Sequence, residues 1–281
     1  MGKQVTELDA LPSFTDNSLL PVHNGAGLKK GLLSQLANYL GNKFSNPNLL
    51  INPDFKINQR GATSYEKQGY SVDRWKIWNV TVTPSTNGGI TVKNDKYTDT
   101  GTFLQYLENA TEGDSTLSCY VTSVSGTVTM VADDDSQVVL KQGLNVVHTS
   151  KSTKAFTIFL NRGTSITLKW VKLEQGKVAT AYIVPNPAEE LVKCKRYYDF
   201  SVLHFYGVCN SNGSLNEDLV LYRHFRTSPT FSTNATHSKN VTVSTLALKG
   251  SNDGGYYLYV RTPTSGTYEL DLTIKADAEI Y

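Results

Sequence analysis

The sequence predicts an all-β protein, and three observations support this. Tyr occurs 16 times, and Thr, Ser, Asn and Gly are frequent; Thr and Tyr favour strands, whereas Gly and Asn favour turns. Several segments alternate apolar and polar residues with the period of two that a half-buried strand requires. Turn residues separate these segments at the short intervals typical of a sandwich or jelly roll. The 281 residues are enough for two domains with separate cores.

Residues 1–45 are predicted to form a small N-terminal module. The strand-like run 19–22 is followed by a turn cluster at 24–27, and Gly41 stands where a helix C-cap belongs. Between them, apolar residues recur at helical spacing and predict a short helix that serves as an anchor. Its apolar stripe comprises Leu28, Leu32, Leu33, Leu36, Tyr39 and Leu40. So short a module cannot bury this stripe, so we expect it to pack on another chain or a larger body; docking on the next domain is the alternative.

Residues 46–185 are predicted to form a jelly-roll β-sandwich. In the segment 164–174 the apolar residues alternate as in a strand. The alternation places Ile166, Leu168 and Trp170 on one face, with Val171 and Leu173 on the other. Trp75 and Trp170 are expected to fill the core of this domain.

Residues 186–281 are predicted to form a linking helix and a second, sandwich-like β tip domain. Asn186 suits the N-cap, Pro187 the first helical position and Glu189 a capping box, with the helix running to about Tyr198. Further along, the segment 268–276 shows the cleanest alternation in the chain, which predicts one buried and one wet face. We expect this strand to form a hairpin with the segment 256–262.

Charge and cysteine content exclude several classes of protein. The net charge is +2 without a basic run, which argues against nucleic acid as a partner. Three distant cysteines give no disulfide framework and no zinc spacing, and they favour folding in a reducing cytoplasm. No segment has the length of a membrane-spanning helix, so no membrane insertion is expected. The run Asp133–Asp135 is interpreted as a turn, so neither a metal nor another cofactor is predicted.

The sequence predicts a protein that is not an enzyme. The five histidines are scattered, and no nucleophile elbow, phosphate-binding loop or dinucleotide-binding glycine pattern occurs. A glycan hydrolase is the least favoured alternative, because its paired carboxylates must face each other at a set separation that no motif indicates.

Aromatic residues provide the remaining functional signal. Sugar rings stack their C–H faces on Trp or Tyr, and nearby polar groups bind their hydroxyls. The first candidate glycan site comprises Tyr65, Tyr70, Asp73, Arg74, Trp78 and Tyr97. The second comprises Tyr256, Tyr257 and Tyr259. The alternative for both is that the rings cover half-buried sheet faces or subunit contacts.

Several segments, taken in order, resemble tail fibres and receptor-binding fibres of bacteriophages. Asn46–Gly61, Tyr70–Trp78 and Trp170–Thr180 are similar to the opening and close of a carbohydrate-binding-like jelly-roll module in these fibres. Pro187–Leu191 and Cys194–Tyr198 are similar to its exit helix, and Phe225–Thr230 and Ala276–Ile280 to the β domain that often follows it. Asp16–Leu40 resembles short fibre-attachment modules, except that Lys30-Gly31 stands where these often carry Ser or Thr before the helix.

The resemblance implies a structural protein of a phage virion that adheres to host-surface glycans through its β domains. It further implies a homotrimer that contacts other virion proteins through residues 1–45. Such a protein is made in the cytoplasm of the bacterial host and lies on the exterior of the virion. A head fibre or a decoration protein of the capsid with no specific ligand is the alternative.

Overall fold

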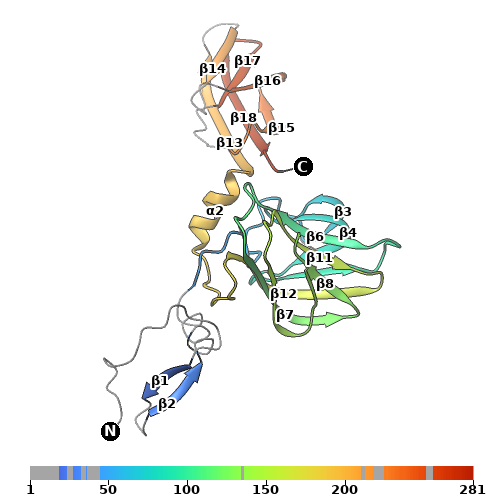
Figure 1. Ribbon diagram of the computed structural model, residues 1–281. Helices are drawn as coiled ribbons and strands as arrows, with labels where there is room; N and C mark the ends of the chain where they lie inside the picture. Colours follow the sequence, from blue (N-terminus) through green and yellow to red (C-terminus); the bar gives the residue numbers. More distant parts are fainter. Residues whose placement is uncertain are drawn as a thin grey trace.

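The computed structural model describes residues 19–23, 28–32, 36, 45–133, 136–209, 213–217, 225–250 and 256–280. Within these ranges the chain is built mainly of β-strands, with a short helix between two groups of strands (Figure 1). The all-β prediction is therefore confirmed.

Two short strands form an antiparallel hairpin near the N-terminus. Strand β1 (Leu19–His23) pairs with β2 (Leu28–Leu32), and His23 lies opposite Leu28. The strand-like character of 19–22 is thus confirmed, but the predicted helix is wrong over 28–32. The turn-forming residues between the two runs favour a hairpin, whereas Gly31 inside a helix costs about 1 kcal/mol relative to Ala.

The predicted anchor residues therefore have three different outcomes. Leu28 and Leu32 are the end residues of β2 instead of helical residues. Leu36 is helical and exposed. Leu33, Tyr39 and Leu40 lie outside the described residues, so their part in an anchor stays a prediction.

Ten strands form one sheet, in the order β10-β7-β12-β5-β4-β6-β11-β8-β9, with β3 paired to β4. This jelly-roll sheet curls around a single apolar core, to which its long strands contribute buried residues (Figure 1). The strands are β3 (Tyr65–Tyr70), β4 (Lys76–Pro84), β5 (Ile90–Asn94), β6 (Gly101–Tyr106), β7 (Ser115–Ser125), β8 (Val128–Val131), β9 (Gln137–Val139), β10 (Gly143–Thr149), β11 (Ala155–Leu160) and β12 (Thr164–Gln175).

Aromatic rings fill the centre of this core. Trp75 is fully buried and stacks on Phe103, with ring centroids 4.7 Å apart and planes 7° from parallel. Phe156 meets the same indole edge-on at 5.9 Å, and Phe55 packs at 5.1 Å. The prediction that Trp75 fills the core is confirmed.

Trp170, in contrast, does not fill the core. The pairing of β12 with β7 shifts register between Thr167 and Leu168 and again between Leu168 and Trp170. Because such a bulge adds one residue, every later side chain moves to the opposite face. Leu168 and Val171 are both buried, and Trp170 is half-buried on the outer face. The predicted alternation is therefore wrong beyond Leu168.

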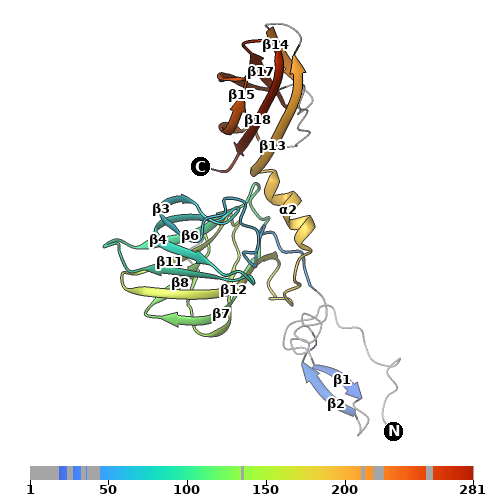
Figure 2. The same cartoon turned by 180° about the vertical axis from the view of Figure 1, so that it is seen from behind.

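Helix α2 (Pro187–Lys195) follows the jelly-roll sheet in the chain and lies between it and the next strands in both views (Figures 1 and 2). As predicted, the Asn186 side chain caps it, accepting a hydrogen bond from the Ala188 N–H at 2.9 Å. The helix ends three residues before Tyr198, where the next strand begins. Its buried Glu190 accepts a hydrogen bond from the Asn52 N–H at 2.7 Å, which fixes the helix to the segment that leads into the jelly-roll sheet.

The remaining strands form two three-stranded sheets, here called the tip sheets. The first has the order β13-β18-β15 and the second β14-β17-β16. Their bounds are β13 (Tyr198–Cys209), β14 (Gly213–Glu217), β15 (Thr230–Lys239), β16 (Thr242–Gly250), β17 (Tyr256–Thr262) and β18 (Gly266–Asp277).

The alternation of β18 is confirmed, but its predicted partner is wrong. Tyr268, Leu270, Leu272, Ile274 and Ala276 are buried, and the residues between them are at least partly exposed. β17 does not form a hairpin with β18; it pairs with β14 and β16 in the other sheet. All twelve residues of β13 pair with β18, which satisfies far more backbone groups than the seven-residue β17 could.

The end of β18 returns to the jelly-roll sheet. The Tyr70 hydroxyl, at the end of β3, donates to the Ile280 carbonyl. Glu279 is buried and forms an ion pair with Arg74. These contacts join the tip sheets to the jelly-roll sheet.

Candidate functional site

The two charged residues of the first predicted glycan site are interior. The Asp73 carboxylate accepts hydrogen bonds from the Gln59 N–H at 2.6 Å and from Gln59 Nε2 at 2.7 Å. Besides its pair with Glu279, Arg74 donates to the Tyr106 carbonyl at 2.7 Å, and its guanidinium lies 3.5 Å from the centre of the Tyr197 ring. Both Asp73 and Arg74 are buried, so neither faces a ligand on the surface.

Three of the four rings of that predicted site are half-buried. Tyr65 is half-buried with its hydroxyl bonded to Asn58, and the Tyr70 hydroxyl is bonded to Ile280. Tyr97 is half-buried in the segment after β5. Of the four, only Trp78 on β4 presents much of its ring to solvent, with 47% exposed.

The second predicted site lies on β17. Tyr256, Tyr257 and Tyr259 belong to this strand, and Tyr259 lies opposite Asn216 of β14. Their side chains are outside the part of the chain that the structure describes, so this site stays a prediction.

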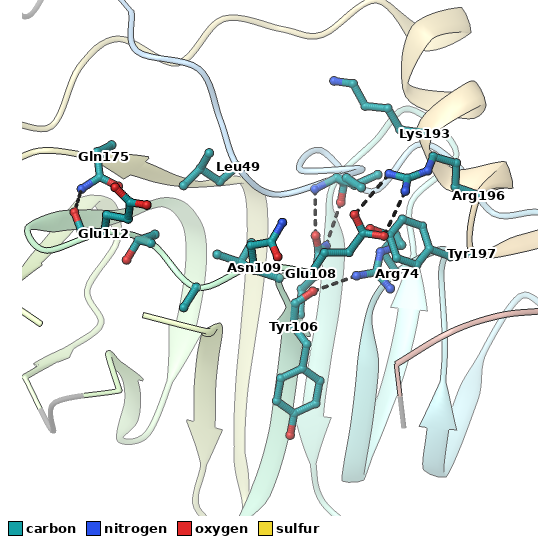
Figure 3. A pocket seen from close by; sticks show the side chains of 15 residues that line it. Leu49, Arg74, Tyr106, Glu108, Asn109, Glu112, Gln175, Lys193, Arg196 and Tyr197 are labelled. Carbon is teal, nitrogen blue, oxygen red and sulfur yellow. Dashed lines mark hydrogen bonds and ion pairs between the residues drawn. The ribbon is translucent and has the colours of Figure 1, made fainter. Parts of the chain in front are cut away.

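A cavity of about 610 Å³ lies where the segment after β6 faces α2 (Figure 3). Leu49 and Leu107 contribute apolar surface to it, and Glu108, Lys193 and Arg196 contribute charges. The Arg196 guanidinium binds both Glu108 oxygens, at 3.1 and 3.2 Å. This pair crosses the junction, whereas Lys193 pairs with Glu190 of its own helix at 2.6 Å.

No aromatic ring offers a stacking surface in this cavity among the residues described. Tyr106 points away from the cavity, and Tyr197 is buried beneath Arg74 (Figure 3). Gln105 exchanges two hydrogen bonds with the Ile51 backbone, at 2.7 and 2.8 Å. We interpret this cavity as the seam between α2 and the jelly-roll sheet, since Arg196 and Glu108 pair across it and no ring is placed for stacking.

A group of aromatic rings outside the core provides a better candidate. Trp170 and Tyr182 stack with centroids 4.5 Å apart and planes 3° from parallel. Tyr120, the residue opposite Trp170 on β7, lies 6.1 Å from the same indole. The Lys169 ammonium is 5.8 Å from the centre of the Tyr120 ring. We call Tyr120, Trp170 and Tyr182 the aromatic platform.

Tyr182 reaches the platform because the segment 177–184, here called the strap, is tied to β12. Lys172 and Glu174 form a buried ion pair at 3.1 Å on the same strand. Lys172 Nζ donates to Thr180 Oγ1 at 2.6 Å and to the Ala181 carbonyl at 3.0 Å, and the Thr180 N–H donates to Glu174 at 2.9 Å. This network satisfies two buried charges and fixes the strap against β12, beside Trp170.

A second cavity, of about 440 Å³, opens beside the platform. Trp170 and Tyr182 line one part, and Asp54, Lys56 and Asn87 supply a carboxylate, an ammonium and an amide. Lys56 Nζ lies 2.8 Å from the Asp54 carboxylate. The cavity thus combines aromatic surface with a few convergent polar groups, as small-molecule sites commonly do.

The tight turn after β4 shapes the polar side of this cavity. The Gly88 N–H donates to the Ser85 carbonyl at 3.2 Å, and the Gly89 N–H donates to the Asp54 carbonyl at 2.8 Å. Gly88 and Gly89 have φ values of +89° and +86°, a region that side chains disfavour. The two glycines therefore let this turn, which carries Asn87, approach Asp54 closely.

The Tyr182 hydroxyl is buried and has no hydrogen-bond partner among the residues described. Burial raises the pKa of Tyr182 well above its ordinary value, and the carboxylates of Asp54 and Glu190 raise it further. The phenol therefore keeps its proton at neutral pH and offers an unused donor next to the cavity.

Sequence reasoning missed this site. It singled out Trp170, but as a core residue, and it did not select Asp54, Lys56, Asn87 or Tyr182. The only available signal was Tyr182 in an otherwise apolar run shortly after the Trp170 strand.

Among the described residues, no group of three or more His, Cys, Asp or Glu side chains is arranged to hold a metal ion. In the same part of the chain, no helix is long and apolar enough to cross a membrane.

No family model and no curated protein matches the chain. Solved structures similar to it include a variant of a family 29 carbohydrate-binding module, with 10% identity and a TM-score of 0.29 over 44% of this chain and all of that one. Discoidin II of Dictyostelium discoideum is similar in two structures. The native recombinant protein has 11% identity and a TM-score of 0.19 over 70% of this chain and 84% of that one. The wild type has 13% identity and a TM-score of 0.20 over 68% and 82%. Similarities this weak carry no argument, so the class of protein rests on the geometry: an all-β protein with an aromatic platform beside a surface cavity.

Proposed function

We propose that the protein is a structural fibre of a phage virion that adheres to host-surface glycans through its jelly-roll sheet. The phage assignment comes from the sequence resemblance. The observation that carries glycan binding is the aromatic platform beside the 440 Å³ cavity.

The chemistry of this site suits a sugar. The apolar C–H face of a pyranose packs on an indole or phenol ring, and the platform offers two parallel rings that are partly exposed. Hydroxyl groups need donors and acceptors at the edge of the ring, which Asp54, Lys56 and Asn87 supply. No catalysis is proposed.

On the virion, the protein is proposed to sit on the exterior, to contact other virion proteins through residues 1–45 and to act as a homotrimer. One such site binds weakly, but sites joined on one fibre gain strongly when they engage a surface together.

Two tryptophans outside the core, the half-buried Trp170 and the exposed Trp78, allow a matched test. We expect Trp170→Ala to weaken binding to host cells and to arrayed host-envelope glycans by about tenfold or more, because truncating an aromatic anchor commonly costs ~2 kcal/mol. Trp78→Ala removes an exposed ring on β4 that does not line the cavity, and it should bind like the wild type.

The outcomes separate the alternatives. Equal loss in both variants, or loss only in Trp78→Ala, would remove the platform from the proposal and favour the first predicted site. If the wild type bound neither cells nor any glycan, the adhesion function would fail, and a decoration protein without a ligand would be favoured.

A further inference from the structure

One face of β13 carries an exposed apolar row. Phe200, Val202, Tyr206 and Val208 are 38%, 67%, 68% and 63% exposed, respectively. They lie at alternate positions of one strand, with the exposed His204 between them, so their side chains share a face. Apolar residues scattered singly on a surface are normal, but a continuous row marks an interaction site.

This face is the outer face of its sheet. Phe200, Val202 and Tyr206 lie opposite Lys275, Thr273 and Glu269 of β18, the residues that alternate with its buried ones. The other face of β13 packs inward, where Leu203 and Phe205 contact the core of Leu270, Leu272 and Ile274. β13 therefore presents apolar residues on both faces, and the residues that the structure describes cover only one of them.

The strand also lacks the charges that usually protect such a position. β13 is at the edge of its sheet, and no Asp, Glu, Lys or Arg occurs from Phe200 to Val208. Edge strands of monomeric proteins commonly carry charged residues that prevent association. A strand without them favours a partner on this face.

We propose that this face packs against a second copy of the same chain. Its charges are complementary to one another. Lys275 stands at one end of the β18 row. Asp271 and Glu269, which pair with His204 and His237 within the chain, stand towards the other. A copy turned end for end brings Lys275 opposite Glu269 and apolar β13 against apolar β13. A face with charges of both signs suits a copy of itself better than a partner of one sign.

The dimensions of the face are adequate. Twelve residues of β13 span roughly 40 Å, and three strands are about 14 Å wide, which gives a face of roughly 550 Å². A standard interface buries about 800 Å² per partner. The face thus supplies most of the area that a stable association needs. The role that we assign to this contact, which is to bring several glycan sites together on one particle, rests on the proposed function. The observations that support the contact itself do not involve glycan binding.

The test compares charges placed on and off this face in the full chain. Val202→Asp combined with Val208→Asp puts two carboxylates into the proposed contact, and Leu144→Asp puts one at a similarly exposed position of the jelly-roll sheet, where Leu144 is 60% exposed. The masses are measured by light scattering at a chain concentration of about 10 µM, at which a complex with a dissociation constant of about 1 µM is mostly associated. The wild type and Leu144→Asp should then have the mass of two or more chains. Because an end-for-end contact joins units in pairs, the double variant should have half the mass of the wild type, whether the paired units are single chains or the proposed homotrimers, and unchanged circular dichroism.

A wild type with the mass of one chain, or a double variant with the mass of the wild type, overturns the inference. If the double variant fails to fold, Tyr206→Thr is measured in its place and should raise the concentration at which the complex dissociates by about tenfold or more. Glycan binding distinguishes the two proposals. A dissociated variant that still binds immobilised glycan supports both, whereas a multimer that dissociates as expected but never binds glycan supports the contact alone.

Discussion

Replacing Glu279 by Gln is expected to loosen the contact between the end of β18 and the jelly-roll sheet. The Glu279 side chain is fully buried and forms ion pairs with Arg74 and with Arg60, the latter at 3.4 Å. Gln has the same shape, so the substitution removes the charge and little else. The buried Arg74 guanidinium and the partly exposed Arg60 guanidinium then lose their nearest counter-charge.

The magnitude follows from the surroundings of the pair. Removing one partner of a buried ion pair commonly costs ~3–5 kcal/mol. Arg74 keeps the Tyr106 carbonyl and the Tyr197 ring, and Arg60 keeps the Tyr198 ring at 3.9 Å. We therefore expect the lower end, about 3 kcal/mol, which is a factor of ~150 in the equilibrium between the docked and the opened strand end.

Hydrogen exchange measures this opening directly. The Arg74 N–H, between β3 and β4, donates to the Glu279 carboxylate at 3.4 Å, so its exchange reports when Glu279 leaves the jelly-roll sheet. We expect Glu279→Gln to accelerate it by about a hundredfold. Glu66→Gln is the control: it removes the exposed Glu66–Lys96 pair, which solvent screens and which should contribute little. Equal exchange at Arg74 in both variants would show that the buried pair does not hold this junction.

Two further predictions concern the jelly-roll sheet and the cysteines. Gly89→Ala should destabilise the protein by about 1–3 kcal/mol, because a Cβ there lies 2.9 Å from the Leu168 carbonyl oxygen at a φ of +86°. Gly61→Ala is the control and should cost less, because Gly61 has a φ of +69° and open space around it. Unfolding in urea is followed by tryptophan fluorescence, and equal midpoints for the two variants would contradict the clash. All three cysteines are buried, and burial raises the pKa of Cys119 to about 12. The native chain should therefore resist iodoacetamide at about pH 8 and react at three sites in urea, as read by mass spectrometry, whereas rapid native labelling would contradict this burial.

The features that the sequence predicted correctly depend on local chemistry. The alternation of β18 needs only a period of two, and the Asn186 cap needs only a side chain that can accept a hydrogen bond two residues on. Trp75 is large and apolar within a strand-rich segment, and the core receives it. None of these depends on which strands become neighbours.

Features that depend on strand neighbours were not predictable. The bulge that turns Trp170 outward arises from the pairing of β12 with β7, and no Gly or Pro marks it in the sequence from Thr167 to Trp170. Likewise, β17 joins a different sheet from β18 although the loop between them suits a hairpin. For the segment 28–32 two local patterns predict different structures. The spacing of the leucines predicts a helix and the turn cluster at 24–27 predicts a hairpin, and the structure contains the hairpin.

The candidate site shows the same limit. Asp54, Asn87, Trp170 and Tyr182 come from four separate parts of the chain, and two of them depend on non-local contacts. The bulge turns the indole outward, and the buried Lys172–Glu174 pair holds the strap that carries Tyr182. A sequence search for clustered aromatics therefore selected residues near Asp73 and Arg74, which serve the interior.

The two proposals are physically coupled through the junction at Glu279. Avidity is greatest when the distance between linked sites is fixed and matches the spacing of the ligands, and it falls as the linkage becomes longer or looser. If copies associate through β13, the tip sheets set their spacing, and the Arg74–Glu279 pair transmits it to the jelly-roll sheet that carries Trp170. Glu279→Gln should then weaken attachment to a glycan-coated surface while leaving the affinity of a single site for a soluble glycan unchanged. An equal loss in both measurements would mean that the substitution damages the site itself, whereas no loss in either would mean that the junction does not set the spacing.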